Sequence, residues 1–233
     1  MKSIKIMSCI LAAGMLFTSC NMSNTGKGAL IGGGSGAAVG AGLGAIFGKG
    51  KGAAVGAAVG TTAGALIGKK MDKAAEQAKQ VEGAQVEQVT DNNGLQAVKV
   101  TFDSGILFST SSSNLSSSAK SSLSKFANDV LNQNRDMDVT IYGYTDNQGW
   151  KNSTAEQSYQ KNLNLSQERA QSVASYLLAC GVSTNQIKSV QGMGEANPIA
   201  DNSTAAGRQE NRRVEIYLYA SQQMIQQAEA GTL

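Results

Sequence analysis

The sequence predicts an α+β fold in which a mixed β-sheet carries helices on one face and follows a glycine-rich helical hairpin. Two observations lead to this prediction. From Val81 onward, short alternating segments typical of strands are separated by longer segments with 3.6-residue periodicity, in the order βαβαββ. Between residues 28 and 68, glycine recurs at every fourth position. The chain of 233 residues has room for about one or two domains.

Composition excludes several classes of protein. The chain has 20 Lys and Arg against 17 acidic residues, a formal net charge of +3, so it lacks the basic excess typical of a nucleic-acid-binding protein. It has no histidine, which excludes His-based triads, His-ligated zinc and a His general base. Cys9, Cys20 and Cys180 lie too far apart for a CxxC pair. We therefore expect no metal and no cofactor.

The first 19 residues have the pattern of a secretory signal peptide. Two lysines precede an apolar stretch of about a dozen residues, which is too short to span the ~30 Å core of a bilayer. The stretch ends in Leu16-Phe17-Thr18-Ser19-Cys20, which resembles a bacterial lipobox. This resemblance implies cleavage before Cys20 and a covalent lipid on its thiol, with residues 20–27 as a lipidated tether. The alternative is an ordinary signal peptide followed by an incidental cysteine.

Eleven glycines at a constant spacing of four, from Gly28 to Gly68, would form one stripe along a helix. Each costs about 0.5–1 kcal/mol of helix stability relative to alanine, so such a helix needs close backbone contacts. The central sequence Gly48-Lys49-Gly50-Lys51-Gly52 predicts the turn of a helical hairpin over residues 28–70. The segment resembles the glycine-zipper domain of bacterial envelope lipoproteins. An exposed helical stalk is expected over residues 71–82.

Three interpretations of this glycine-rich segment are open. The hairpin inserts into a membrane, or it packs as a compact hairpin or homo-oligomeric bundle, or the segment is a disordered linker. The constant spacing and the aliphatic residues between the glycines favour the first two interpretations over a linker.

The elements expected in the rest of the chain are predicted from hydrophobic periodicity, turn residues and helix-start signals. The first expected elements are a hairpin over residues 86–102 with an Asn-Gly turn and a helix that opens at Leu115–Ser118 and buries Ala119, Leu123, Phe126, Ala127, Val130 and Leu131. A strand containing Val139 and Ile141 follows, and then a helix that starts near Ser166 and buries Ala170, Val173, Ala174, Leu177 and Leu178. The last expected elements are strands at Ile187–Gln191 and Val214–Tyr219. Cys180 lies on the apolar face of the second helix, and we interpret it as a buried free thiol.

Four separated motifs resemble the OmpA-like peptidoglycan-binding domain, which we place at residues 83–220, followed by a tail over 221–233. The motifs are Ile141-Tyr142-Gly143-Tyr144-Thr145-Asp146-Asn147-Gln148-Gly149, Asn162-x-x-Leu165-Ser166-x-x-Arg169-Ala170, Gly192-x-Gly194-Glu195-x-x-Pro198-Ile199-Ala200-x-Asn202 and Gly207-Arg208-x-x-Asn211-Arg212-Arg213-Val214-Glu215. The sequence departs from the family at Tyr144, where a histidine is usual, and in the interval Trp150–Gln160, which is longer than in short members.

The resemblance implies that this domain binds the diaminopimelate stem peptide of peptidoglycan, whose free end carries an ammonium beside a carboxylate. Asp146, at a strand end, is expected to take the ammonium. Arg169, expected in the first turn of its helix, can grip the carboxylate with two parallel hydrogen bonds, aided by the helix dipole. Asn162 and Asn147 are candidate further donors, and Arg208 either adds positive potential or orders the sheet.

Simpler roles are open for several of these residues. Asp146 alternatively closes only an Asx turn, and Arg169 alternatively forms only a surface salt bridge. Of Arg212 and Arg213, we expect one to be structural beneath the pocket and the other to be solvated.

The whole chain is similar to OmpA-family outer-membrane lipoproteins. This similarity implies a non-enzymatic tether that faces the periplasm, with lipid in the outer membrane at one end and peptidoglycan at the other. The alternative is an envelope assembly protein whose zipper oligomerises or acts on membranes and whose C-terminal domain only localises it. A wall hydrolase is disfavoured, because without histidine it needs a pair of carboxylates, and Asp146 with Glu195 is a weak candidate.

Overall fold

A mixed β-sheet forms the centre of the C-terminal part of the chain. The computed structural model describes residues 61–91 and 94–233. Its strands are β1 (Ala84–Thr90), β2 (Gln96–Asp103), β3 (Met137–Gly143), β4 (Ile187–Gly192) and β5 (Arg213–Ala220). They lie in the order β1-β2-β5-β3-β4, with β3 and β4 parallel and the other neighbours antiparallel. The predicted α+β class with a mixed sheet is confirmed.

The predicted βαβαββ order corresponds to β2, α5 (Ser117–Phe126), β3, α6 (Ala155–Ala179), β4 and β5. The hairpin adds β1 at the edge of the sheet. Two short helices complete the order, α4 (Ser104–Leu107) after β2 and α7 (Ala205–Asn211) before β5. Gly94 has a φ of +74° in the hairpin turn, where a left-handed backbone favours glycine.

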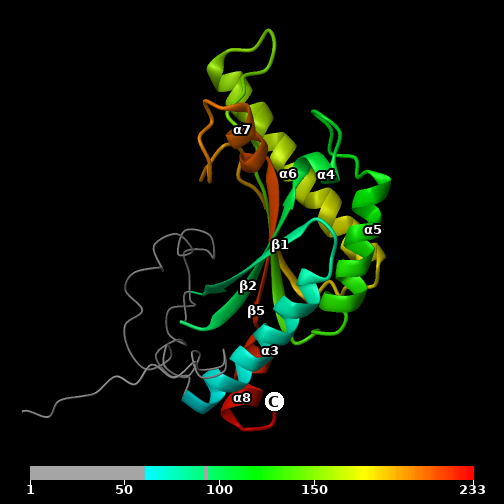
Figure 1. Cartoon of the computed structure of the whole chain (residues 1–233), viewed down its shortest axis with the longest axis vertical. Coiled ribbons are helices and arrows are strands. Elements are labelled where there is room, and N and C mark those ends of the chain that lie inside the picture. Colours follow the sequence, from blue (N-terminus) through cyan, green and yellow to red (C-terminus); the bar gives the residue numbers. More distant parts are fainter. Residues whose placement is uncertain (1–60, 92–93) are drawn as a thin grey trace, which may run out of the picture.

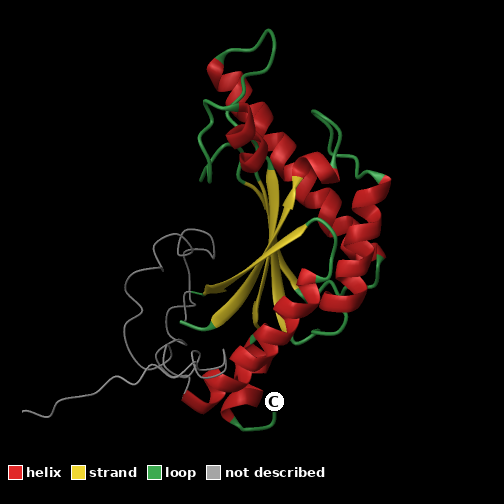
Figure 2. Ribbon diagram, in the orientation of Figure 1, coloured by secondary structure: helices red, strands yellow, loops and turns green. Residues whose placement is uncertain are grey.

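The helices α3, α5 and α6 lie on the same face of the sheet (Figures 1 and 2). Alternate residues of each strand point toward this helical layer, because successive side chains leave a strand on opposite faces. The register places Val100 and Ile141 on either side of Ile216, and all three are fully buried. Phe102 meets Phe126 of α5 edge-on, with ring centroids 5.8 Å apart. Each such side chain contributes about 1.5–3 kcal/mol by leaving water, so this layer is the main hydrophobic core.

The first predicted helix is confirmed, with a change at its C-terminal end. The Ser116 Oγ caps α5 by accepting the Ala119 N–H at 3.0 Å. After Phe126 the helix widens into a π-helical turn, η1 (Ala127–Leu131). Its six predicted apolar positions are all fully buried: Ala119, Leu123, Phe126, Ala127, Val130 and Leu131.

The second predicted helix begins about three turns earlier than expected. Thr154 Oγ1 accepts the Gln157 N–H at 3.2 Å, and the Gln157 side chain accepts the Thr154 N–H at 2.9 Å. This capping box starts α6 at Ala155, so the expected start near Ser166 is wrong. The interval from Trp150 to Gln160 is therefore a loop only as far as Thr154.

The apolar face of α6 is mostly as predicted. Its buried members are Ala170, Val173, Ala174 and Leu177. Leu178 is only partly buried. Cys180 is a free thiol at the C-cap of α6, but it is also only partly buried, and its Sγ lies 3.6 Å from the Ser124 Oγ. The prediction of a buried thiol is corrected accordingly.

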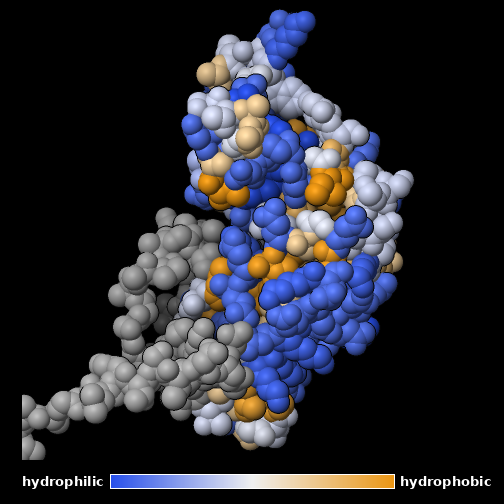
Figure 3. Space-filling model, in the orientation of Figure 1, coloured by the Kyte–Doolittle hydropathy of each residue, from blue (hydrophilic) through white to orange (hydrophobic). Residues whose placement is uncertain are grey.

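The helix expected to be an exposed stalk packs on the sheet instead. α3 (Thr61–Lys79) continues through the two lysines expected to end the zipper. Met71, Ala74 and Ala78 are fully buried, because their spacing forms an apolar stripe that contacts β1, β2 and α8 (Gln222–Glu229). The outward side of α3 is hydrophilic (Figure 3). The C-terminal tail is likewise ordered as α8, which buries Met224.

The interpretations of the signal peptide, of Cys20 and of the glycine stripe up to residue 60 concern residues outside the described part. Two glycines of the stripe lie within α3. Within the described part of the chain, a Cβ on Gly64 would meet nothing within 4 Å, and one on Gly68 would lie 3.2 Å from the Gln96 side chain. Among the described residues, no helix has both the length and the apolar character that crossing a bilayer requires.

Candidate functional site

The neighbouring strands β2, β5 and β3 have their ends side by side at one end of the sheet. The Ser104 N–H, just after β2, donates to the carbonyl of Arg212, the residue directly before β5, at 2.9 Å. On the other side of β5, the Tyr144 N–H after β3 donates to the Arg213 carbonyl, also at 2.9 Å. Ser104, Arg212 and Thr145-Asp146 consequently line one cleft of about 560 Å³. Strand ends on a rigid sheet are common positions for binding residues.

Helix α6 reaches this end of the sheet because two strands present glycine to it. A Cβ on Gly143 would collide with the backbone carbonyl of Ser166, and one on Gly192 would collide with the backbone nitrogen of Gln167. The absence of side chains lets the α6 backbone lie directly on β3 and β4. Three residues beyond Ser166, Arg169 lines the cleft.

Arg169 is held by two contacts, and one of its buried nitrogens has no partner among the described residues. It is only 3% exposed, its Nε donates to the Ser112 carbonyl at 3.0 Å, and its guanidinium lies 5.2 Å from the centre of the Phe108 ring. Its Nη1 is buried and has no hydrogen-bond partner in the described part of the chain. Burial lowers the pKa of Arg169, as does the charge of Arg212, while Asp146 acts in the opposite direction. A buried N–H without an acceptor costs about 1–3 kcal/mol, so this position favours an acceptor from a ligand.

Asp146 pairs with Arg212, which lies directly before β5. One carboxylate oxygen accepts the Gln148 N–H at 3.0 Å, and the other accepts from Arg212 Nη1. The Asx turn considered from the sequence is thus present, and the second carboxylate oxygen forms the ion pair with Arg212 in the cleft. Arg212 also donates to the Gln209 side chain. The charged side chains among the described residues that line the cleft are three cations and one anion: Lys151, Arg169, Arg212 and Asp146. The cleft is therefore net positive.

Asn162 of α6 fixes the loop that follows Asp146. Its Nδ2 donates to the carbonyls of Asp146 and Gln148 at 3.4 and 3.2 Å, and its Oδ1 accepts the Trp150 indole N–H at 2.7 Å. The Trp150 backbone N–H donates to the Ser158 Oγ at 3.0 Å. Asn162 lines the cleft, and its side chain holds this wall in shape.

Two of the predicted site residues lie away from the cleft. Asn147 is exposed and does not line it. Arg208 Nη1 donates to the carbonyls of Asn202 and Ser203 at 2.8 and 3.1 Å, so this residue orders the loop before α7. Of the five residues predicted from the sequence, the structure brings Asp146, Arg169 and Asn162 together.

Arg213 is structural. It is 3% exposed, its Nε donates to a Glu215 carboxylate oxygen at 2.8 Å, and its guanidinium lies 3.8 Å from the centre of the Tyr144 ring. Tyr217 donates its hydroxyl to the other Glu215 oxygen at 2.9 Å. Tyr144, the departure from the usual histidine, thus supplies the aromatic face on which Arg213 rests, directly before the residues that line the cleft.

Several cleft residues were missed by the sequence analysis. The adjacent pair Arg212 and Arg213 was expected to divide into one structural and one solvated residue, but Arg212 pairs with Asp146. Adjacent side chains of an extended segment point in opposite directions, so the sequence indicates that the two arginines have different roles. It does not indicate that Asp146 is the partner of Arg212. Phe108 and Ser104 come from the segment after β2, which has no periodic pattern. Because Arg169 lies in the middle of α6, the expected contribution from a helix N-terminus is wrong.

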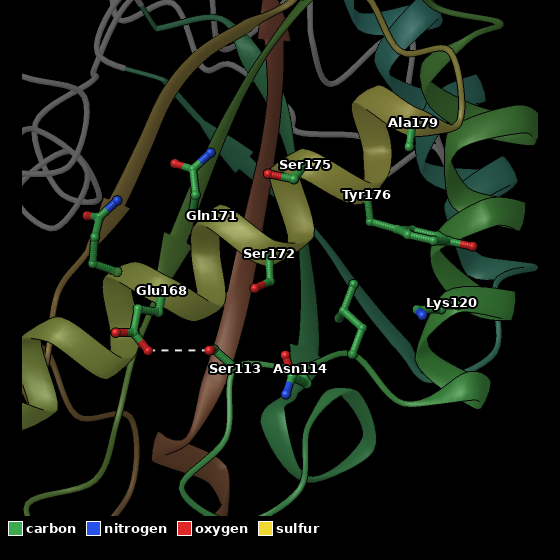
Figure 4. Close-up of a pocket in the computed structure, with 11 residues that line it drawn as sticks. Ser113, Asn114, Lys120, Glu168, Gln171, Ser172, Ser175, Tyr176 and Ala179 are labelled. Atoms are coloured by element: carbon green, nitrogen blue, oxygen red, sulfur yellow. Dashed lines mark hydrogen bonds between the residues drawn. The ribbon is translucent and has the colours of Figure 1, made fainter.

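Two consecutive residues of α6, Glu168 and Arg169, form hydrogen bonds with the segment before α5, and these contacts join the helix and the segment into one wall. A shallow groove of about 700 Å³ lies beside this wall. Ser113 Oγ donates to Glu168 at 3.3 Å, and the dashed line in Figure 4 marks this bond. The neighbouring Arg169 bonds the Ser112 carbonyl. The polar side-chain atoms that are buried without a partner lie elsewhere in the described residues, so nothing in this groove indicates a ligand. Among the residues described, no cluster of three or more Cys, Asp or Glu side chains is suited to a metal ion.

Two family models and several known proteins match parts of this chain. Residues 107–212 match the OmpA family, and residues 1–72 match the YMGG-like Gly-zipper. The probable lipoprotein YiaD of Escherichia coli is 44% identical over 119 residues, which are 51% of this chain and 47% of YiaD. The peptidoglycan-binding protein ArfA of Mycobacterium tuberculosis is 49% identical over 88 residues, 38% of this chain and 24% of ArfA. The outer-membrane lipoprotein YfiB of Pseudomonas aeruginosa is 38% identical over 117 residues, 50% of this chain and 64% of YfiB.

A solved structure, the cell wall anchor of the T6SS from Pseudomonas aeruginosa, superposes with a TM-score of 0.50 at 26% identity, covering 65% of this chain and 97% of that one. The matched segments span only about a quarter to two thirds of the lengths of the three sequence relatives. The cleft residues Phe108, Asp146, Asn162, Arg169 and Arg212 all fall within the matched range. Residues 107–212 are an OmpA-family domain, and the chain carries it behind a YMGG-like glycine-zipper segment.

Proposed function

We propose that this chain is a non-enzymatic lipoprotein that tethers the outer membrane to peptidoglycan. A lipid on Cys20 holds one end in the outer membrane, and the OmpA-family domain faces the periplasm and binds the cell wall. The names of ArfA and of the cell wall anchor support the wall as the partner. The names of YiaD and YfiB support the lipid anchor and the outer membrane.

The observation that carries the proposal is the buried Nη1 of Arg169, which has no partner among the described residues. Arg169 lines the net-positive cleft. An arginine can only donate hydrogen bonds, so the missing partner is an acceptor, and the positive surroundings favour a carboxylate. Nε is already bound to the Ser112 carbonyl, and the guanidinium packs against the ring of Phe108. The arginine is therefore preorganised to receive a carboxylate with little loss of side-chain entropy.

The wall component that fits this cleft is the free end of diaminopimelate in a stem peptide. It carries an ammonium beside its carboxylate, and Asp146 supplies the carboxylate that an ammonium needs, on the same cleft as Arg169. Lysine at the same position of a stem peptide keeps the ammonium but lacks the neighbouring carboxylate. A cleft that grips both groups therefore prefers diaminopimelate to lysine.

Binding without catalysis is supported by the charged groups present. Asp146 is the one carboxylate among the described residues that line the cleft, and it is engaged with Arg212. Glu195, the partner considered for a hydrolase, does not line the cleft. The two-carboxylate arrangement of a glycosidase is thus not met by these residues.

The test compares single-residue variants of the full mature chain in detergent, by pull-down with purified sacculi and by calorimetry with a diaminopimelate-containing stem peptide. Arg169→Ala and Asp146→Asn should each weaken binding by about ten- to a hundredfold, because hydrogen bonds to charged groups contribute about 1.5–3 kcal/mol. The combined effect should be less than additive, since both residues grip one ligand. Salt should weaken binding only moderately, because the charges lie in a cleft.

Arg208→Ala is the matched control, because Arg208 carries the same charge but lies outside the cleft. It should bind like the unmodified chain, and circular dichroism should show that all three variants are folded. A stem peptide with lysine in place of diaminopimelate should bind more weakly. If folded Arg169→Ala and Arg208→Ala bind sacculi equally well, the proposed function of this cleft is wrong.

A further inference from the structure

Two hydroxyl groups in the cleft share the unpartnered state of the Arg169 nitrogen. Ser104 is 1% exposed and Thr145 is 5% exposed, and both side-chain oxygens are buried without a hydrogen-bond partner in the described part of the chain. Six side-chain atoms of this kind occur among the described residues, and three of them belong to residues that line this single cleft. Buried polar atoms in folded proteins are normally paired, so their concentration at one place indicates groups awaiting a ligand.

The three groups come from different elements that are firmly placed. Ser104 follows β2 and is bonded through its N–H to the Arg212 carbonyl at 2.9 Å, while the Thr145 N–H donates to the Gly194 carbonyl at 2.8 Å. The two hydroxyls therefore belong to strand ends on either side of β5, where Arg212 stands. Arg169 is added from α6. Their backbones are fixed by hydrogen bonds, which makes a rearrangement that pairs them with each other costly.

The chemistry of these groups selects the kind of atom that they bind. Arg169 only donates, and a hydroxyl is able to donate as well as accept. The cations Arg212 and Lys151 also line the cleft, whereas Asp146, the one carboxylate among the described lining residues, is already paired with Arg212. A carboxylate offers about four acceptor sites and a negative charge to such surroundings. A carboxamide has half of those acceptor sites, no charge, and an NH₂ group that meets further donors.

We propose that the Ser104 and Thr145 hydroxyls contact the ligand and, together with Arg169, make the cleft select a carboxylate over a carboxamide. This rests on the proposed function, and it extends that function from the class of ligand to its state of amidation. Stem peptides with a free carboxylate on diaminopimelate bind, and those amidated at this group are rejected.

The test removes each hydroxyl while preserving the shape of the side chain as far as possible. Ser104→Ala and Thr145→Val are compared in the full mature chain by calorimetry with L-alanyl-γ-D-glutamyl-meso-diaminopimelate and with the same peptide carrying an amide on the distal carboxylate. Each variant should lose about tenfold in affinity for the free acid, and its preference for acid over amide should shrink. Thr145→Ser, which retains a hydroxyl, should restore most of the affinity.

The melting temperature without ligand should not fall in these variants, in contrast to their affinity for the stem peptide. A hydroxyl that is buried without a partner destabilises the free protein, so its removal should leave the melting temperature unchanged or raise it. Ser122→Ala is the matched control, because Ser122 is buried at 8% exposure outside this cleft. It should change neither the affinity nor the preference.

The inference is overturned if Ser104→Ala and Thr145→Val keep the full affinity and preference for the acid. It is also overturned if both lower the melting temperature without affecting binding, since the hydroxyls then serve the fold alone. Arg169→Ala separates this failure from that of the proposed function. If Arg169→Ala loses binding and the hydroxyl variants do not, only the role of the hydroxyls is wrong.

Discussion

Replacing Gly143 by alanine should disturb the cleft although this residue does not line it. The added Cβ would collide with the Ser166 carbonyl oxygen, lie 3.1 Å from the Ser166 carbonyl carbon and lie 3.4 Å from the Ala170 Cβ. Its nearest atoms belong to helical backbone, which cannot rotate away as the end of a long side chain can. The clash can be relieved only if α6 moves off β3, and Arg169 moves with it.

The expected cost follows from this geometry. Overpacking of a core contact costs about 1–3 kcal/mol, and a clash with backbone belongs at the upper end. A loss of about 3 kcal/mol lowers the urea midpoint by about 1–2 M if unfolding has a slope of ~2 kcal/mol/M. Affinity for the stem peptide should fall by at least tenfold in the fraction that remains folded, because arginine and carboxylate no longer share the same geometry.

Gly64→Ala is a matched control for this substitution. Among the described residues, a Cβ on Gly64 would meet nothing within 4 Å, and the residue lies inside helix α3, where alanine is favoured by about 1 kcal/mol. The same chemical change should therefore stabilise the protein at one position and destabilise it at the other. If Gly143→Ala unfolds at the same urea concentration as the unmodified chain, α6 is not seated on the glycine and the argument for the placement of Arg169 fails.

Three further predictions concern the loop, the tyrosines and the anchor. Asn162→Leu removes the bonds to Asp146, Gln148 and Trp150, so it should cost about 2–3 kcal/mol and redshift the fluorescence of Trp150, the single tryptophan of the chain; an unshifted spectrum would contradict it. Burial raises the pKa of Tyr142 to about 12 and raises that of Tyr144, which also faces Glu215. The unfolded chain releases these protons near pH 10, so stability is complete below that pH and falls as the pH rises to about 12. Tyr144→Phe should reduce this loss in urea titrations at about pH 9 and about pH 11, and equal losses would argue against it. Cys20→Ala should abolish metabolic labelling with a fatty-acid analogue, and label retained by the variant would refute the lipobox.

The strands and the core were predictable because their signals are local. Alternation identified the strand around Val139 and Ile141, and 3.6-residue periodicity identified the face of α5 that includes Leu123 and Phe126. The early start of α6 was also readable, since Thr154 and Gln157 have the spacing of a capping box. The burial of α3 was equally predictable from its apolar stripe at Met71, which the expected exposed stalk did not take into account.

The site was only partly predictable because its contacts join distant parts of the chain. Asp146 and Arg169 could be named from their motifs. The partner of Asp146 is Arg212, 66 residues away, and its identity depends on how β3 and β5 align. Ser104 and Phe108 reach the cleft only through the pairing of β2 with β5. No local pattern reports such a pairing, so these residues required the structure.

Among the described residues of the cleft, the anion Asp146 is paired with a protein group, whereas Nη1 of Arg169 is not, and this difference predicts which contact supplies most of the affinity. An ammonium that binds Asp146 must displace or share Arg212, so one charged interaction is gained while another is weakened. A carboxylate that binds Arg169 Nη1 displaces no protein partner among the described residues. Asp146→Asn should therefore weaken binding less than Arg169→Ala, by about tenfold against about a hundredfold. Calorimetry of both folded variants with one stem peptide measures this order directly. A larger loss in Asp146→Asn would show that the pair with Arg212 costs the ligand little and that the ammonium supplies most of the affinity.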